Sequence, residues 1–247
     1  MRRVAHVAPL AGFALLLSAA LPASDLGYWY RLALQAGSPS GQQHWVSVPY
    51  LYSPPDVNSN LLLDAEDLAQ DLQPIGLPHP CTQAADNCAV AEVAGWDEVT
   101  GTYISWTSGG AGTPFTLEPG EAYRLTLQAV SGQSLHVVDV AGTHDPTLSF
   151  SECYVAGGVN LRWVSLPPHL AVGTSSGITG VLDAEDLGQA MGGAPAVFMV
   201  RQLNPSTGRY EGWVVGSAYG TPFAVDTTRG CGVDILSCPW DWAPPTQ

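Results

Sequence analysis

Short runs of aromatic and β-branched residues, alternating in part with polar residues, recur along most of the chain. Four clear examples are residues 28–34, 45–50, 123–127 and 135–140. Gly, Pro, Asn and Ser separate these runs, as is typical of strands joined by turns. The pattern therefore predicts a mainly β protein.

At two places the pattern changes to that of a short helix. Asp64 and Asp183 are each followed by Ala-Glu-Asp-Leu, which places an N-cap residue before a first turn rich in acids. The next apolar residues are four positions apart, as on one face of a helix: Leu68 with Leu72, and Leu187 with Met191. The acidic clusters are therefore interpreted as helix starts.

These motifs belong to a set that occurs twice in the same order. The pairs are W-V-S-x-P at 45–49 and 163–167, D-A-E-D-L at 64–68 and 183–187, T-G-x-Y at 100–103 and 207–210, and G-T-P-F at 112–115 and 220–223. A spacing of roughly 110 residues is far longer than a solenoid repeat. The sequence thus predicts two tandem homologous small β-sandwich or β-barrel domains, each with one short helix.

The first 23 residues have the pattern of a secretory signal peptide. Arg2 and Arg3 precede an apolar stretch at 10–21, and Ala20 and Ala23 are small residues suited to cleavage. The apolar stretch is too short to span a bilayer. We therefore expect a signal peptide at 1–23, domain 1 at 24–144 and domain 2 at 145–247. The expected location is secreted and extracellular, or periplasmic.

The chain is acidic and contains no lysine. Its formal net charge is −14, and only six arginines remain after the signal peptide against 22 acidic residues. Such a field repels nucleic acid phosphates and anionic lipid surfaces. We therefore expect neither nucleic acid binding nor membrane insertion, while the oligomeric state is left open.

An exported chain favours disulfides, and five cysteines are present: Cys81, Cys88, Cys153, Cys231 and Cys238. Repeat 1 has 12 more residues than repeat 2 between the helix and the T-G-x-Y motif, and Cys81 and Cys88 lie in or beside this insertion. We expect them to close that loop. Cys231 aligns with Tyr123 on an inward-facing strand position, which favours a buried thiol for Cys231 and a bridge between Cys153 and Cys238. The pairing of these last three cysteines stays open.

One loop of repeat 1 has the spacing of a calcium site. Oxygen-bearing side chains occupy loop positions 1, 3, 5 and 12, namely Asp56, Asn58, Asn60 and Asp67. Residues 56–68 resemble an EF-hand or dockerin calcium loop, which implies a calcium-ordered docking module. Leu61 occupies position 6, where such loops carry Gly, and residues 175–182 of repeat 2 lack these ligands. The alternative is a capped loop that needs no ion.

Eight tryptophans suggest stacking on a sugar, but four of them form pairs that recur in both repeats. Trp45 matches Trp163 and Trp106 matches Trp213, so these four are interpreted as core. In the tail, Trp240 and Trp242 have no counterpart. They either pack back onto the domain or present a ligand surface.

The repeated unit, from W-V-S-x-P at 45 to P-G-E-A-Y at 119–123, resembles a group of uncharacterised secreted bacterial proteins built of tandem β-repeats. The resemblance implies a fold unit and an extracellular setting. Together these features favour a non-catalytic surface, matrix or binding protein with a glycan or protein ligand and without a cofactor, calcium excepted. One alternative is a secreted hydrolase whose dispersed carboxylates, in the loop at 74–88 and at Glu211, meet in space.

Overall fold

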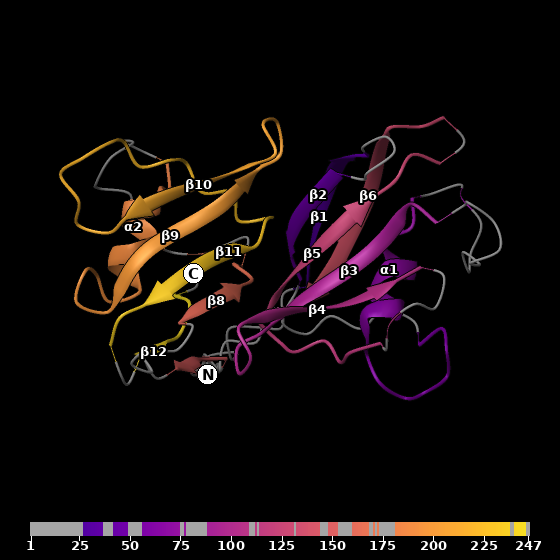
Figure 1. Ribbon diagram of the computed structural model, residues 1–247, viewed down its shortest axis with the longest axis horizontal. Helices are drawn as coiled ribbons and strands as arrows, with labels where there is room; N and C mark the ends of the chain where they lie inside the picture. The colour runs from indigo at the N-terminus through magenta and orange to yellow at the C-terminus, as the bar shows by residue number, and fades with distance from the viewer. Residues whose placement is uncertain are drawn as a thin grey trace, which may run out of the picture.

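The computed structural model describes residues 27–36, 42–48, 56–74, 77, 88–108, 112, 114–130, 132–143, 148–152, 160–167, 170, 172, 181–237 and 240–245. The protein is mainly β, with two four-stranded antiparallel sheets, two small two-stranded sheets and two short helices. The two sequence repeats lie side by side, with repeat 1 in indigo to magenta and repeat 2 in orange to yellow (Figure 1).

Repeat 1 forms a sheet in the order β2-β5-β3-β4 and a second sheet of β1 and β6. Its elements are β1 (Gly27–Gln35), β2 (Gln42–Ser47), α1 (Ala65–Asp71), β3 (Val90–Asp97), β4 (Thr102–Thr107), β5 (Ala122–Leu127) and β6 (Leu135–Thr143). Apolar side chains of α1, of β1 and β6, and of the four-stranded sheet form one buried core. The repeat is therefore a small sandwich with its helix at the edge of the core.

Repeat 2 has the same plan. Its sheet has the order β8-β11-β9-β10, and β7 pairs with β12 as the second sheet. The elements are β7 (Phe150–Glu152), β8 (Leu161–Val164), α2 (Ala184–Ala190), β9 (Val197–Asn204), β10 (Arg209–Val214), β11 (Cys231–Ile235) and β12 (Trp240–Trp242). Element for element, this is the strand order and chain order of repeat 1. The predicted fold class is confirmed.

The two helices begin in the same way. Asp64 and Asp183 are extended N-cap residues, and each forms a capping box with the Asp three positions later, Asp67 or Asp186. The first helical amide then donates to a strand-like segment, Ala65 N to Phe115 O and Ala184 N to Phe223 O, at 3.0 Å in both repeats. The duplicated D-A-E-D motif therefore starts a helix and fastens it to the G-T-P-F segment.

Strand limits differ slightly from the sequence pattern. The strand expected at 45–50 is β2, which begins three residues earlier at Gln42 and ends at Ser47. Pro49 follows two positions later and has no N–H to donate to a ladder, which favours an early end. Within the described residues, no helix is long and apolar enough to cross a membrane.

Candidate functional site at the seam between the repeats

The two four-stranded sheets meet through the faces that point away from their own cores. Trp45 on β2 and Trp163 on β8 stack between them, with ring centroids 3.8 Å apart and ring planes 7° from parallel. Ala122 and Leu203 pack beside this pair in a buried cluster shared by both repeats. Because side chains alternate along a strand, β2 sends Val46 into the core of repeat 1 and Trp45 into this contact. We call the contact centred on Trp45 and Trp163 the seam.

Tyrosines extend the aromatic contact. Tyr103 lies 6.1 Å from the Trp45 ring, and Tyr210 lies 5.7 Å from the Trp163 ring, each within its own repeat. Across the seam, Trp45 Nε1 donates a 2.8 Å hydrogen bond to Tyr210 Oη. Trp45 and Trp163 therefore belong to the contact between the repeats, whereas the sequence pattern predicts them in the cores of the separate domains.

Hydrogen bonds cross the seam in matching pairs. Ser47 N donates to Thr228 O at 3.2 Å, and Ser165 N, in the equivalent place of repeat 2, donates to Gly120 O at 2.7 Å. The serine hydroxyls accept in the same reciprocal way, Ser47 Oγ from Leu166 N at 3.1 Å and Ser165 Oγ from Val48 N at 2.8 Å. Such reciprocity is the mark of a two-fold contact, here between two parts of one chain.

The seam is closest where Ala122 and Gly230 occupy equivalent positions. A Cβ atom on Gly230 would stand 2.4 Å from Ala122 Cβ and 3.2 Å from Trp45 Cβ. There is space for one methyl group at this contact, and repeat 1 supplies it. This close approach lets the flanking backbone hydrogen bonds form.

An ion-pair cluster closes one side of the seam. Arg162 on β8 pairs with Glu98, in the turn between β3 and β4, and its Nη2 lies 3.6 Å from Glu121 Oε1. Its guanidinium carbon lies 5.4 Å from the centre of the Phe150 ring. A charged side chain of repeat 2 thus crosses to two acids of repeat 1.

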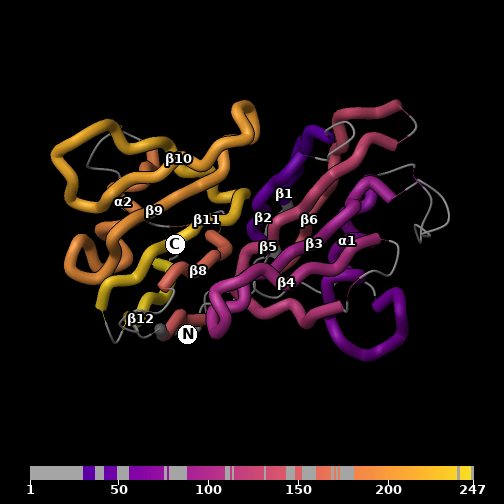
Figure 2. The backbone as a smooth tube through the Cα atoms, in the orientation of Figure 1, coloured from indigo at the N-terminus to yellow at the C-terminus, as the bar shows by residue number. Residues whose placement is uncertain are grey.

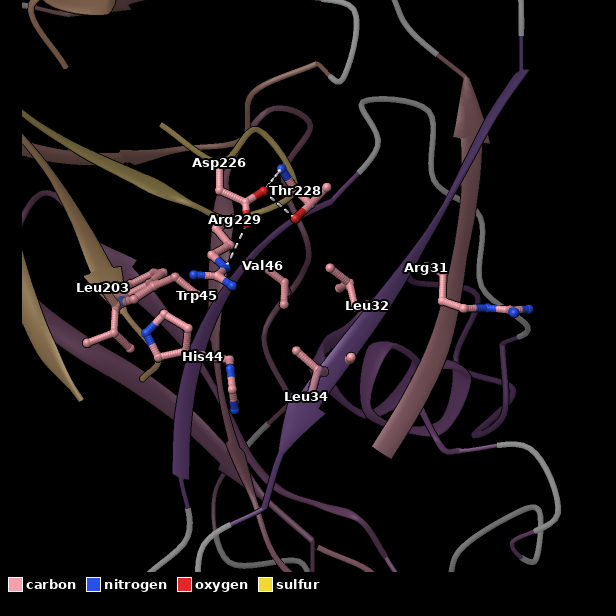
Figure 3. Close-up of a pocket in the computed structure, with 12 residues that line it drawn as sticks. Arg31, Leu32, Leu34, His44, Trp45, Val46, Leu203, Asp226, Thr228 and Arg229 are labelled. Atoms are coloured by element: carbon pink, nitrogen blue, oxygen red, sulfur yellow. Dashed lines mark hydrogen bonds and ion pairs between the residues drawn. The ribbon is translucent and has the colours of Figure 1, made fainter. Parts of the chain in front are cut away.

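The opposite side of the seam contains a pocket of about 190 Å³. It is formed by β1, β2, the end of β9, the following turn and the segment before β11, so both repeats contribute walls (Figure 3). Its lining residues are Arg31, Leu32, Ala33, Leu34, His44, Trp45, Val46, Leu203, Pro205, Asp226, Thr228 and Arg229. We call this space the seam pocket.

The repeat alignment explains why the two sides differ. His44, which immediately precedes Trp45, aligns with Arg162, which immediately precedes Trp163. Pro205 and Arg229 stand where repeat 1 has Glu98 and Glu121. The pocket therefore lies at the place that the Arg162 ion pairs fill on the other side.

The segment before β11 positions the charged group of the pocket. Asp226 Oδ1 accepts from Thr228 N at 3.0 Å and from Thr228 Oγ1 at 2.6 Å, while its Oδ2 lies 3.0 Å from Arg229 Nε. The carboxylate therefore holds one edge of the guanidinium. In Figure 3 the guanidinium of Arg229 extends toward Trp45 and His44, whereas that of Arg31 points away from them.

His44 lies on the pocket wall as a buried, neutral imidazole. Its Nε2 donates to Gln35 O at 2.8 Å, which leaves Nδ1 as the acceptor of the neutral ring. Burial lowers the pKa of His44 below its usual 6.5; the bond to Gln35 opposes this, and the positive charge of Arg229 adds to the lowering. The ring therefore stays uncharged near neutral pH.

The calcium-like loop forms a wide turn that projects beside α1 (Figure 2). Asp56 at position 1 accepts from the amides of positions 5 and 6, Asn60 N at 3.2 Å and Leu61 N at 2.9 Å. Asp67 at position 12 accepts from Val57 N at 2.8 Å and is fully buried. The carboxylates of positions 1 and 12 therefore fix the loop backbone.

The amides at positions 3 and 5 both face the N-cap carboxylate. Asn58 Nδ2 and Asn60 Nδ2 donate to Asp64 Oδ2 at 3.0 and 2.7 Å. Their amide oxygens accept from the backbone, Asn58 Oδ1 from Asn60 N at 3.1 Å and Asn60 Oδ1 from Leu62 N at 2.7 Å. Among the described residues, no three His, Cys, Asp or Glu side chains are grouped so that they could hold a metal ion. Calcium binding at Asp56, Asn58, Asn60 and Asp67 stays a prediction.

Trp240 and Trp242 do not form an exposed surface. They are 2% and 4% exposed, and they belong to the core of repeat 2, where Trp242 stacks on Phe150. Trp240 Nε1 also donates to Met191 O at 2.8 Å. Of the two alternatives, the structure shows that the rings pack back onto the domain, because β12 pairs with β7 and both rings are buried, and the possible ligand surface at Trp240 and Trp242 is wrong.

The cysteines agree in part with their expected roles. Cys231 is a free, fully buried thiol on β11, as its alignment with Tyr123 indicates, and burial raises its pKa to about 12. Cys88 is disulfide-bonded. Its partner lies outside the described residues, as do Cys81, Cys153 and Cys238, so the expected pairings stay predictions.

The carboxylates of the hydrolase alternative are placed only in part. Glu211 lies exposed on β10 and accepts a 2.8 Å hydrogen bond from Asn204. Most of the loop at 74–88 lies outside the described residues. Comparison with models of protein families, with curated proteins and with solved structures found no match.

The seam pocket was not foreseen from the sequence. A signal for it was present, because the two copies, once aligned, exchange Arg for His at one position and Glu for Arg at another. Such differences point to a site only when both positions are known to face the same space. That knowledge comes from the reciprocal packing of the repeats.

Proposed function

We propose that this chain is a secreted, non-catalytic binding protein of two β-repeats, which takes up an end group of a glycan or protein ligand in the seam pocket. The observation that carries the proposal is the one-sidedness of the pocket. Within the described residues the seam repeats its contacts on both sides, but a pocket lies on the side of His44 and Arg229, whereas Arg162 pairs with Glu98 and Glu121 on the other.

Further support comes from how the pocket is built. Its walls belong to both repeats, and ligand sites are frequent between domains. The serine and backbone hydrogen bonds between the repeats hold these walls together. A pocket fixed in advance binds without the entropic cost of ordering its walls.

The test is to map binding by NMR on the chain from residue 24 onward. Oligosaccharides and short peptides are added to protein labelled at its indole and imidazole groups. The proposal predicts ligand-dependent shifts at Trp45 and His44. Binding that shifts other tryptophans and histidines, and leaves these two unchanged, would contradict it.

The second candidate is a calcium-ordered docking module, and the loop backbone favours it. Ser59 and Leu61, at positions 4 and 6, have φ of 57° and 64°, and Asp56 accepts from the amides at positions 5 and 6. A sharp turn at position 6 is the backbone geometry that EF-hand calcium loops use. Without an ion, the same loop is only a helix cap.

We predict that calcium raises the thermal unfolding midpoint of the wild-type chain, and that a chelator reverses the rise. At a concentration of 100 times Kd the gain is about 2.7 kcal/mol. Asp67→Asn removes the calcium effect. Its matched control is Asp186→Asn, which alters the same capping box in repeat 2 and leaves the effect intact. An unchanged midpoint in wild type would rule the ion out.

A further inference from the structure

We infer that the group bound in the seam pocket is a carboxylate carried on a small body. This inference rests on the proposed function and specifies its ligand chemistry. Three features support it: the free edge of one guanidinium, the different charges on the opposite side of the seam, and the small volume of the pocket.

Arg229 supplies the anion-binding group. Its Nε is held by Asp226 at 3.0 Å, and both Asp226 oxygens are engaged within the same short segment. In the described part of the chain, no hydrogen bond is made by Nη1 or Nη2 of Arg229. These two nitrogens form the edge that binds a carboxylate through two parallel hydrogen bonds.

The opposite side of the seam shows what the equivalent space accommodates. There a guanidinium, that of Arg162, lies between the carboxylates of Glu98 and Glu121. In the pocket, neutral His44 aligns with Arg162 and neutral Pro205 aligns with Glu98, while the cation Arg229 aligns with the carboxylate of Glu121. The space that a cation fills on one side therefore faces a guanidinium on the other, which suits an anion.

The size of the pocket limits the body of the ligand. Both apolar and polar residues line it, among them Leu34, Leu203, Trp45 and His44. Its volume is about 190 Å³, which suits a single ring or a short branched chain rather than a long one.

The formal net charge of −14 opposes the approach of any anion. Recognition therefore depends on contacts made at short range inside the pocket. Neutral His44 adds one acceptor there, and it becomes a second cationic donor when an anion beside it favours its protonated form. Carboxylate binding is thus expected to raise the measured pKa of His44.

The experiment compares three isosteric probes on the chain from residue 24 onward: benzoate, neutral benzamide and cationic benzamidine. Binding is measured by calorimetry and located by the imidazole resonances of His44. We expect benzoate to bind at least about tenfold more tightly than benzamide, and benzamidine not to bind. Glucuronate and N-acetyl-leucine, added separately, distinguish a sugar acid from the carboxyl end of a peptide.

Two arginine variants make the test specific. Arg229→Gln removes the charge from the pocket and is expected to weaken benzoate at least about tenfold. Arg31→Gln is the matched control, because Arg31 also lines the pocket but its guanidinium pairs with Asp139 outside. It should leave benzoate affinity within about twofold, since exposed ion pairs contribute little.

The outcomes separate the two proposals. Equal or tighter pocket binding of benzamide or benzamidine overturns the carboxylate inference and leaves the pocket as a binding site. Benzoate binding that Arg229→Gln does not weaken also overturns it. If no probe, oligosaccharide or peptide shifts His44 or Trp45, both proposals fail together.

Discussion

At the scale of single residues, the loop before α1 is under backbone strain. Ser59 and Leu61 are the non-glycine residues with left-handed backbone in the described part of the chain. A branched side chain in this region costs about 1–2 kcal/mol. Leu61 is also 91% exposed, so its side chain gains little packing in return. The strain is therefore a property of the loop conformation.

Replacing Leu61 with Asn should stabilise the protein, because Asn tolerates left-handed backbone and no buried contact is lost. We predict an increase of about 1 kcal/mol in the free energy of unfolding, measured with denaturant. Val99→Asn is the control, because Val99 is 95% exposed in a turn but has no positive φ. A gain in the control as large as that at Leu61 would contradict the strain argument.

His44 should make the protein less stable in mild acid. Burial keeps its folded-state pKa below 6.5, so as the pH falls through 6.5 the unfolded chain takes up a proton first. Stability is complete above pH 6.5 and is lost as the pH falls toward the folded-state pKa. The charged residues that line the pocket with the ring are Arg31, Asp226 and Arg229, and the charge of Arg229 lowers the pKa of His44.

The variant His44→Gln keeps a donor for Gln35 O and cannot titrate. We predict that its free energy of unfolding falls less steeply than that of wild type between pH 7 and pH 5. Denaturant unfolding at a series of pH values measures both slopes. Parallel slopes would show that His44 does not carry the acid sensitivity.

At the scale of elements, β5 and the segment before β11 meet so closely that one methyl group fits between them. Gly230→Ala should therefore destabilise by about 1–3 kcal/mol, the range for overpacked cores. The double variant Ala122→Gly with Gly230→Ala moves the methyl group to the other repeat and should recover most of the loss. Thermal unfolding measures both. A double variant as unstable as Gly230→Ala alone would contradict the reciprocal packing.

The sheets also show that equivalent positions exchange their residues. In repeat 1, Arg124 on β5 lies beside Ala94 on β3; in repeat 2, Arg201 on β9 lies beside Gly232 on β11. A Cβ on Gly232 would stand 2.7 Å from Arg201 Cγ. Each sheet therefore has space for one arginine at this place, supplied by either strand. As at the contact of Ala122 with Gly230, the space admits the larger side chain from one partner alone.

The helices were predictable because a capping box is local: Asp64 and Asp67 lie three positions apart and act on the same turn. The strands were predictable from alternation. Alternation alone does not say what covers the outer face of a sheet, so Trp45 could be recognised as buried but not as a seam residue. The pocket depends on side chains from distant segments, such as His44 and Arg229, and no local pattern joins them.

At the scale of the whole molecule, the chain behaves like a two-fold dimer joined in one polypeptide. Duplication gives both sides of the seam the same contacts, and later differences then act on one side alone. Arg162 with Glu98 and Glu121 closes one side. His44, Pro205 and Arg229 leave the other open, without disturbing the reciprocal hydrogen bonds of the seam.

If this asymmetry makes the binding site, transplanting the closed side of the seam into the open side should abolish binding. The variant combines His44→Arg, Pro205→Glu and Arg229→Glu. Calorimetry with benzoate and thermal unfolding are measured on this variant and on wild type. The account predicts that benzoate binding is lost while the unfolding midpoint stays within a few degrees, because the other side already holds this arrangement. A folded variant that still binds benzoate as wild type does would contradict the account.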